Sequence, residues 1–165
     1  MNGPEPQCAG TVLLVRPATF AANPETLASN RFQTAPASGA GQESARGSVL
    51  GEFDRLAARL AEEIRVHVYA DTPLPAKPDA VFPNNWFSTH ADGSLVLYPM
   101  LAPNRRLERR RELLEDLERD GPYRVTRVVD LTHFEARGEF LEGTGSLVLD
   151  RTHRIAYACR SPRTH

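Results

Sequence analysis

The sequence predicts a mixed α/β protein. Three observations predict this class: short β-branched runs of strand length, two segments whose apolar residues recur at steps of three and four, and the pair Asp92-Gly93 between two apolar runs. Asp-Gly in that setting is the strongest short-range signal for a β-hairpin. The chain has 165 residues, 41% of them hydrophobic, which is enough to bury one core but not two.

The first strand is predicted at residues 11–16, TVLLVR, because Pro17 lacks a backbone donor and stops the ladder. Residues 17–42 are rich in Ala, Asn, Ser, Gly and Pro and show little periodicity. They are expected to form a long loop, and its segment 34–42, TAPASGAGQ, is expected to be mobile.

A long amphipathic helix is predicted at residues 44–65, where one apolar stripe recurs at helical spacing. The stripe consists of Val49, Phe53, Leu56, Ala57, Leu60, Ala61 and Ile64. A strand is predicted next, at residues 66–70. The proline-punctuated segment 71–78 is expected to be an irregular connection.

The hairpin signal predicts paired strands at residues 80–88 and 94–99. A second helix is predicted at residues 104–120, ended by Gly121 and Pro122. Its expected core residues are Leu107, Leu113, Leu114 and Leu117. Its arginines are interleaved with acidic residues, which favours a solvated helix face over a phosphate site. These arginines are Arg105, Arg106, Arg109, Arg110 and Arg111.

A further strand is predicted at residues 123–131, and a second strand pair at residues 145–149 and 154–159. Cys159 alternates with apolar residues on the last of these strands and is expected to be a core cysteine. Cys8 lies in a polar tail, where nothing would lower its pKa.

The overall charge argues against two classes of partner. Twenty basic residues against twenty-one acidic ones give a net charge of -1, so nucleic acid and acidic lipid are not expected as partners. The amino terminus has no basic region followed by an apolar one, and no run of eighteen apolar residues occurs. With only two cysteines, a soluble cytoplasmic protein is the simplest expectation.

Three segments carry more polar chemistry than packing requires. Residues 82–90 include Asn84, Asn85 and His90, but Asn-Asn after proline is also common turn chemistry. In residues 140–146, Glu142 precedes two glycines, which allow a close backbone approach. An exposed glutamate before a turn would show the same pattern.

The third polar segment follows the first predicted strand, where Arg16 is succeeded by several polar residues that end at Asn30. Loop capping is the more favoured explanation of this segment.

Three segments together resemble one family. They are VRPATFAANPETLASNRFQ at residues 15–33, DTPLPAKPDAVFPNNWFSTHADGSLVLYPMLAPNRRLERR at 71–110 and FLEGTGSLVLDRTHRIAYACRSPRTH at 140–165. They resemble the amino-terminal half of the citrulline-utilisation hydrolases, which are amidinotransferase-related members of the guanidino-group-modifying, or pentein, superfamily. On this resemblance residues 1–10 are a flexible tail, and residues 11–165 are the amino-terminal part of a pentein-type domain.

The resemblance implies an α/β propeller of ββαβ units, present here as a partial propeller. It also implies attack by a cysteine thiolate on the planar carbon of a guanidino or ureido group. Glu142 matches the substrate-binding glutamate of arginine deiminases, and Asn85 stands where their guanidinium-binding aspartate would be. An amide both donates and accepts, which suits the neutral ureido group of citrulline better than a guanidinium.

The candidate substrate-binding residues are therefore Asn84, Asn85, Glu142, Arg16, Asn30 and His90. Glu142 is expected to hold the substrate rather than the fold, because its neighbouring glycines allow a close approach. No cofactor and no metal ion are expected, since the spacing of His133 and the glutamates near it matches no common ligand pattern. Self-association is left open.

The family's catalytic histidine and cysteine lie downstream of the segment that matches Glu142. A carboxy-terminal half that is absent from these residues is therefore expected to supply them, in a hydrolase that converts citrulline to ornithine. The alternative is a truncated, non-catalytic module that binds a ligand or a partner.

Overall fold

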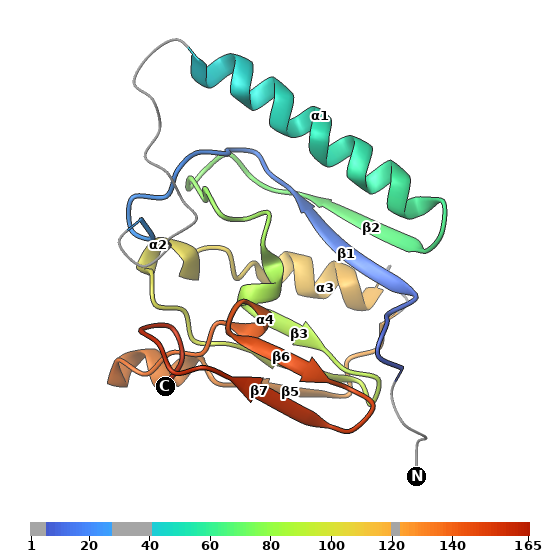
Figure 1. Ribbon diagram of the computed structural model, residues 1–165, viewed down its shortest axis with the longest axis vertical. Helices are drawn as coiled ribbons and strands as arrows, with labels where there is room; N and C mark the ends of the chain where they lie inside the picture. The colour runs from blue at the N-terminus through green and yellow to red at the C-terminus, as the bar shows by residue number, and fades with distance from the viewer. Residues whose placement is uncertain (1–5, 28–40, 120–122) are drawn as a thin grey trace. The chain divides into compact units, whose positions relative to one another are not determined.

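The computed structural model describes residues 6–27, 41–119 and 123–165 (Figure 1). The chain divides into two compact units. One is Gly10–Phe82, and the other joins Met1–Ala9 to Pro83–His165. The predicted α/β class is confirmed, because each unit combines strands with a helix.

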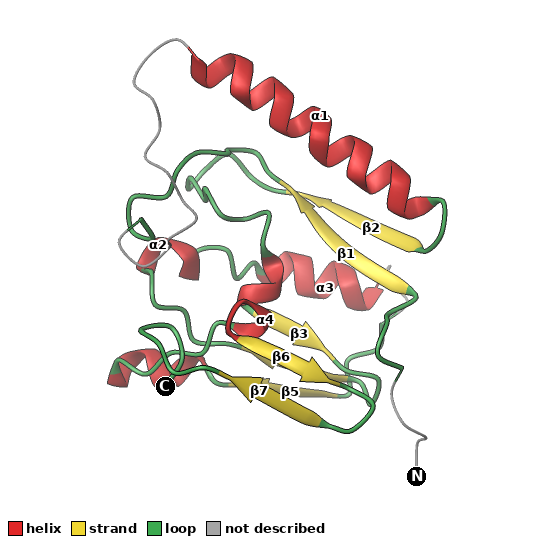
Figure 2. Cartoon of the chain, viewed as in Figure 1, coloured by secondary structure: helices red, strands yellow, loops and turns green. Residues whose placement is uncertain are grey.

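The unit Gly10–Phe82 is a β-α-β arrangement. Strand β1 (Thr11–Arg16) pairs in parallel with β2 (Arg65–Ala70), from Thr11 opposite Arg65 to Arg16 opposite Ala70. Helix α1 (Gly41–Ala61) connects them and lies beside the strand pair (Figure 2). A parallel pair needs such a crossover, because the chain must return to the edge where the first strand began.

Sequence reasoning located these elements with small errors. The strand at 11–16 is confirmed, and the predicted helix at 44–65 begins earlier and ends at Ala61, where residues 62–64 form a turn. Phe53 is buried as expected, whereas Leu56 is exposed. Of the segment predicted to be mobile, residues 34–40 lie outside the described residues, and Gly41 and Gln42 belong to α1 rather than to a loop.

The irregular connection at 71–78 is fixed by the only lysine of the chain. The Lys77 ammonium group is buried, pairs with Asp71 at 3.2 Å and donates to the carbonyl oxygens of Thr72 and Pro75 at 3.0 and 2.8 Å. A buried ammonium needs acceptors for its three N–H groups. The connection therefore folds around the cation, not around apolar side chains.

The unit that contains Pro83–His165 holds a three-stranded sheet of order β3-β4-β5. Strand β3 (Phe87–Thr89) is antiparallel to β4 (Ser94–Leu97), and β5 (Arg127–Asp130) is parallel to β4. Helices α2 (Pro103–Arg106) and α3 (Arg111–Arg119) lie in the connection from β4 to β5. These elements make one ββαβ unit.

A second strand pair follows the ββαβ unit. A 3-10 helix, η2 (Thr132–Arg137), and the short helix α4 (Gly143–Ser146) lead into β6 (Leu147–Asp150), which is antiparallel to β7 (Ile155–Ala158). The 3-10 helix η1 (Pro83–Asn85) precedes β3 in the same way that α4 precedes β6. Two hairpins of this unit are therefore each introduced by one short helical turn.

The turn between β3 and β4 matches the Asp-Gly signal. Asp92 accepts a hydrogen bond from the backbone nitrogen of Ser94 at 2.9 Å, and this bond holds the pKa of Asp92 below its ordinary value. Gly93 has a φ of +82°, in the left-handed region. The predicted strand at 80–88 is shorter than expected, because residues 83–85 form η1 instead.

The helix predicted at 104–120 is two helices, and Leu107 at the break is exposed rather than in the core. The physical reason is that Arg105, in α2, and Glu108, in the turn after it, are buried at 2% and 3% exposure. Leu113 and Leu117 of α3 are buried as predicted, with Trp86, Leu95 and Met100. Among the described residues no helix is long and apolar enough to cross a membrane.

The last strands are also shorter than the predicted ranges. The strand predicted at 123–131 covers Arg127–Asp130, and β7 ends at Ala158. Cys159 therefore lies beyond the strand and is exposed, so the expectation of a core cysteine is wrong. Cys8 is exposed, as predicted.

Replacing Gly93 with alanine is expected to destabilise the unit more than replacing Gly138. Both glycines have positive φ, so an alanine adds about 1–2 kcal/mol of strain at either position. Only at Gly93 would the new Cβ lie 2.5 Å from Thr126 Oγ1 and 2.9 Å from the Arg124 carbonyl oxygen, which costs roughly a further 1–3 kcal/mol. Urea unfolding followed by circular dichroism measures both variants, and equal losses would contradict the steric argument.

Candidate functional site

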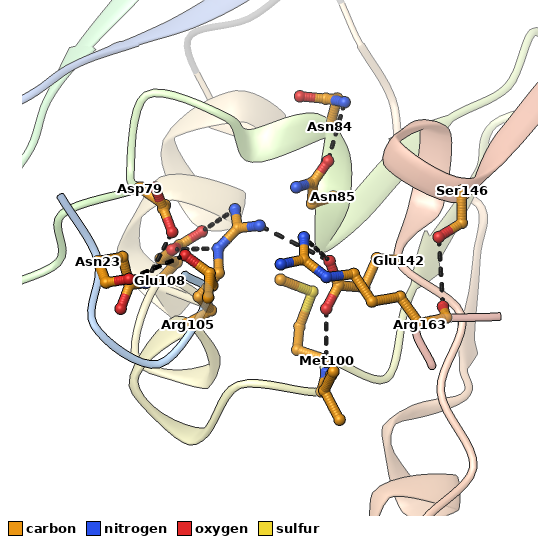
Figure 3. Close-up of polar contacts among 12 residues, drawn as sticks. Asn23, Asp79, Asn84, Asn85, Met100, Arg105, Glu108, Glu142, Ser146 and Arg163 are labelled. Carbon is orange, nitrogen blue, oxygen red and sulfur yellow. Dashed lines mark hydrogen bonds and ion pairs between the residues drawn. The ribbon is translucent and has the colours of Figure 1, made fainter. Parts of the chain in front are cut away.

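Glu142 is held inside the second unit by two hydrogen-bond donors and by an ion pair with a further arginine, each from a different segment. Its side chain is 1% exposed. Oε1 accepts from the backbone nitrogen of Leu101 at 3.1 Å, and Oε2 lies 3.3 Å from Arg163 Nη1 and 3.7 Å from Arg105 Nη1 (Figure 3). The Glu142 backbone nitrogen donates to the Arg163 carbonyl oxygen at 3.3 Å. Glu142 therefore makes contacts that hold the fold, which the sequence does not lead us to expect; its role in holding a substrate stays a prediction.

Arg105 is a buried arginine that pairs with both Glu108 and Glu142. Its Nε and Nη2 donate to the two carboxylate oxygens of Glu108 at 2.8 and 3.0 Å, a bidentate pair between nearly inaccessible side chains. The remaining nitrogen, Nη1, faces Glu142. Two guanidinium groups, those of Arg105 and Arg163, thus face two carboxylates, and the formal charges of the four groups cancel.

Asn84 and Asn85, on η1, lie against α4. The Asn84 side-chain amide lies 3.1 Å from Thr144 Oγ1. A Cβ added at Gly143 would lie 2.2 Å from the Asn84 carbonyl oxygen, and one added at Gly145 would lie 2.3 Å from a terminal atom of the Asn85 side-chain amide. The two glycines are therefore required for η1 to approach α4. The sequence had indicated instead that they leave room for a ligand.

The Asn85 amide also contacts Arg105. With the amide oxygen turned toward Arg105, it accepts from Nη1 at 2.5 Å and from Nη2 at 3.2 Å. The opposite orientation would place amide N–H groups against guanidinium N–H groups, which only donate. Asn85 and Glu142 therefore both contact Arg105.

The arginines predicted to lie on a solvated face bind the backbone beside Glu142. Arg106 donates to the carbonyl oxygens of Met100 and Leu101 at 3.0 and 3.3 Å. Arg109 donates to Glu135 at 2.5 and 3.0 Å, and Glu135 accepts from the Met100 nitrogen at 2.8 Å. Glu135 and Glu142 thus accept from the consecutive backbone N–H groups of Met100 and Leu101. The solvated-face interpretation holds for exposed Arg111 and not for Arg105.

The other candidate residues lie apart from this group. His90, on the β3–β4 turn, approaches Ser88 Oγ at 2.9 Å, and its backbone nitrogen donates to the Tyr123 hydroxyl at 3.1 Å. It borders a cavity of about 520 Å³ that is also lined by Arg127, Arg151 and Arg154. Asn84, Asn85 and Glu142 are not among the residues that line this cavity.

Arg16 belongs to the Gly10–Phe82 unit, where it donates to both carboxylate oxygens of Asp54 at 2.8 and 2.9 Å. These bonds hold the pKa of Asp54 below its ordinary value. Asn30 lies outside the described residues. In the polar segment after β1, Asn23 accepts from the Glu25 backbone nitrogen at 3.1 Å, as a capping residue does.

Sequence reasoning missed Arg105, Glu108 and Arg163 as members of the site. The i, i+3 spacing of Arg105 and Glu108 was available as a signal. The exposed pair of Arg119 with Asp116 has the same spacing, however, so the signal cannot separate a buried pair from a surface pair.

The ββαβ unit and the family match that follows support an α/β protein of the guanidino-group-modifying pentein superfamily. The chain belongs to the family whose model is described as N,N dimethylarginine dimethylhydrolase, eukaryotic, which matches residues 16–165. Among curated proteins none matches the sequence.

Solved structures share the fold at low identity. Unliganded AgrE matches at 22% identity and a TM-score of 0.62, over 90% of this chain and 19% of its own. ArgZ, an arginine dihydrolase from the ornithine-ammonia cycle in cyanobacteria, matches at 20% identity and 0.61, over 93% of this chain and 21% of its own. The N-terminal domain of an ArgZ variant, covalently bound to a reaction intermediate, matches at 18% identity and a TM-score of 0.62. The match covers 90% of this chain and 47% of that domain's chain. The chain thus spans from about a fifth to about half of the length of these proteins.

Glu108→Gln is expected to lower the free energy of unfolding by about 2–4 kcal/mol, because it leaves the buried Arg105 guanidinium without its bidentate counter-charge. The matched control is Glu115→Gln, which breaks an exposed pair with Arg111 and should cost less than about 0.5 kcal/mol. Denaturant unfolding compares the two variants. Similar small losses would mean that Glu108 contributes no more than a surface charge.

Proposed function

We propose that this chain supplies the substrate-binding groups of a hydrolase that acts on the C–N bond of a ureido or guanidino amino acid, with citrulline as substrate and ornithine as product. The observation that carries the proposal is the Glu142 carboxylate gathered with the Asn84–Asn85 amides around Arg105. We further propose that the ββαβ unit is one blade of an α/β propeller, of which the described residues form a part.

The relatives support this class of substrate. One AgrE structure is a cysteine-to-alanine variant with L-arginine, and another holds ornithine and NAD+. ArgZ is itself described as an arginine dihydrolase. Arginine is therefore the second candidate substrate for this chain.

The charges around Glu142 favour the neutral substrate. Arg105 and Arg163 already face its carboxylate, so a cationic guanidinium at this carboxylate would approach two cations at close range, in a group of four charges that Glu108 already balances. Like charges a few ångströms apart repel each other strongly where water is excluded. The ureido group of citrulline carries no charge and avoids this repulsion.

The residues present can orient a planar ligand. A carboxylate has about four lone-pair directions, so Glu142 retains capacity for a ligand N–H beyond its own contacts. The exposed Asn84 amide offers a polar edge from the facing segment. A planar ureido group held by its edges leaves its carbon open to attack from above the plane.

Neither cysteine of the chain is part of the Glu142 group, and both are exposed. We therefore propose that a thiolate and a proton-transferring histidine come from outside these residues. The thiolate would attack the ureido carbon, and hydrolysis with one water would convert citrulline to ornithine, ammonia and carbon dioxide.

A second candidate function is a module that binds a ligand or a partner without turnover. The observation that favours it is the apolar surface of the β6–β7 hairpin, where Val148, Ile155 and Tyr157 are exposed. Exposed apolar side chains that lie close together are typical of surfaces that contact another protein.

The full-length gene product is expected to release ornithine from citrulline faster than from arginine, by at least about tenfold in kcat/KM, because only the neutral group avoids Arg105 and Arg163. Ornithine is quantified with either substrate at equal concentration. A preference for arginine would exclude citrulline as the main substrate, and release from neither would favour the non-catalytic module.

The 165-residue chain alone is expected to release no ornithine from citrulline, because its two thiols are exposed and outside the site. Purified chain is incubated with citrulline, with Cys159→Ala as the control variant. Turnover that this one substitution abolishes would make Cys159 the nucleophile and would contradict the proposal of an external thiolate.

A further inference from the structure

We propose that the cavity lined by the β3–β4–β5 sheet and the β6–β7 hairpin is a second small-molecule site, which binds a monocarboxylate with an apolar body and pairs its carboxylate with Arg154. The inference goes beyond the proposed function, because Asn84, Asn85 and Glu142 do not line this cavity. All of its lining residues belong to the unit that contains Pro83–His165.

The size and the strand lining of the cavity suit the apolar body of a small ligand. Its volume of about 520 Å³ lies within the range of ligand pockets in proteins, roughly 300–1,000 Å³. On one side Val96 of β4 lies opposite Val129 of β5. On the other side Leu149 of β6 lies opposite Ala156 of β7. The paired strands therefore contribute apolar side chains to the lining from both sheets.

The face of β4 that carries Val96 is not covered by the core. Side chains alternate between the two faces of a strand, so Ser94 and Val96 lie on one face of β4 and Leu95 lies on the other. Leu95 is buried in the core, whereas Val96 is only half-buried. The face with Val96 borders the cavity and is left for a ligand to cover.

The charges of the lining favour an anion over a cation. Two aspartates line the cavity, and each accepts a hydrogen bond from a backbone nitrogen of its own turn, at 2.9 Å. These bonds hold the pKa of Asp92 and the pKa of Asp150 below their ordinary values, so both carboxylates are charged at neutral pH. The lining also holds Arg127, Arg151 and Arg154. Three cations beside two anions leave an excess of positive charge that attracts a carboxylate.

Arg154 is the arginine that we expect the ligand to pair with. Arg127 donates to Ser94 Oγ at 3.0 Å and lies 4.0 Å from an Asp92 carboxylate oxygen. Arg151 donates to a backbone carbonyl oxygen at 3.2 Å. Within the part of the chain that the structure describes, the Arg154 guanidinium makes no ion pair and no hydrogen bond. It can offer two parallel N–H groups to a carboxylate, and its flexible side chain gives it the reach to do so.

The backbone at Arg154 gives a second, independent reason. Arg154 has a φ of +59° and is the only described residue other than glycine with a positive φ. Glycine adopts this left-handed conformation without the steric cost that a Cβ brings. The turn itself therefore gives no reason for an arginine at this position. A guanidinium group that serves the cavity supplies one.

The first test compares three ligands that differ only in their head group: 4-phenylbutyrate, 4-phenylbutanol and 4-phenylbutylamine. Calorimetry with the full-length gene product should show the carboxylate binding at least about tenfold more tightly than the alcohol, because it gains a charge-assisted hydrogen bond. The amine should bind more weakly than the alcohol. Equal affinities for the three, or no binding of the carboxylate, would overturn the inference.

Arg154→Gly separates binding from the conformation of the turn. Affinity for 4-phenylbutyrate should fall by about tenfold, to the level of the alcohol, while the unfolding temperature does not fall, because glycine tolerates the positive φ. Arg154→Gln, which removes the charge and keeps a Cβ, should weaken binding to the same extent. The control is Arg111→Gln, at an exposed arginine outside the cavity, which should bind as the wild type does. Wild-type affinity in both Arg154 variants would contradict the assigned role.

A pair of alanine substitutions on β7 places the ligand. Ala156→Leu puts a larger side chain into the cavity and should weaken binding of 4-phenylbutyrate by about tenfold or more. Ala158→Leu makes the same change two residues further along the strand, outside the lining, and should alter the affinity by less than about twofold. Thermal unfolding shows that both variants fold. Equal effects of the two substitutions would mean that the ligand binds elsewhere. These measurements need no turnover of citrulline, so they stand or fall independently of the proposed function.

Discussion

A guanidinium group can be buried only where acceptors and counter-charges surround it, and Arg105 meets this condition through Glu108, Glu142 and Asn85. These partners come from the turn after α2, from the residue before α4 and from η1. Each of these elements is short and has little stability of its own. Their common arginine therefore fixes the positions of elements that local propensity alone would leave loose, and the candidate site consists of the groups it gathers.

The backbone allows this arrangement because two glycines bring η1 against α4. Gly143 and Gly145 lie so close to Asn84 and Asn85 that a methyl group at either position would overlap them. Both helical turns precede the first strand of a hairpin, so the repeated order of helix, strand and strand places them at corresponding ends of their strands. The polar residues at those ends can meet although they are far apart in sequence.

In the proposed function, the same group would link stability to ligand choice. A cluster of two cations and two anions has no net charge with which to attract a charged ligand. What it can still offer a ligand is hydrogen bonding, through lone pairs and N–H groups. In the proposed function such a site would discriminate by the pattern of donors and acceptors more than by charge. Under the proposed function, substitutions that improve packing around Arg105 would therefore alter recognition too, because one hydrogen-bonded group would serve both purposes.

The sequence by itself determined the α/β class, strand β1, the approximate extent of α1 and the Asp-Gly hairpin, because periodicity and turn chemistry act within a few residues. It also singled out Asn84, Asn85 and Glu142. Only the tertiary structure decided that Arg105 is buried and that the predicted second helix breaks at Leu107. Burial of a charge depends on partners distant in sequence, such as the Leu101 nitrogen and the Glu142 carboxylate, which lie 41 residues apart. No local pattern distinguishes such an arginine from one that faces water.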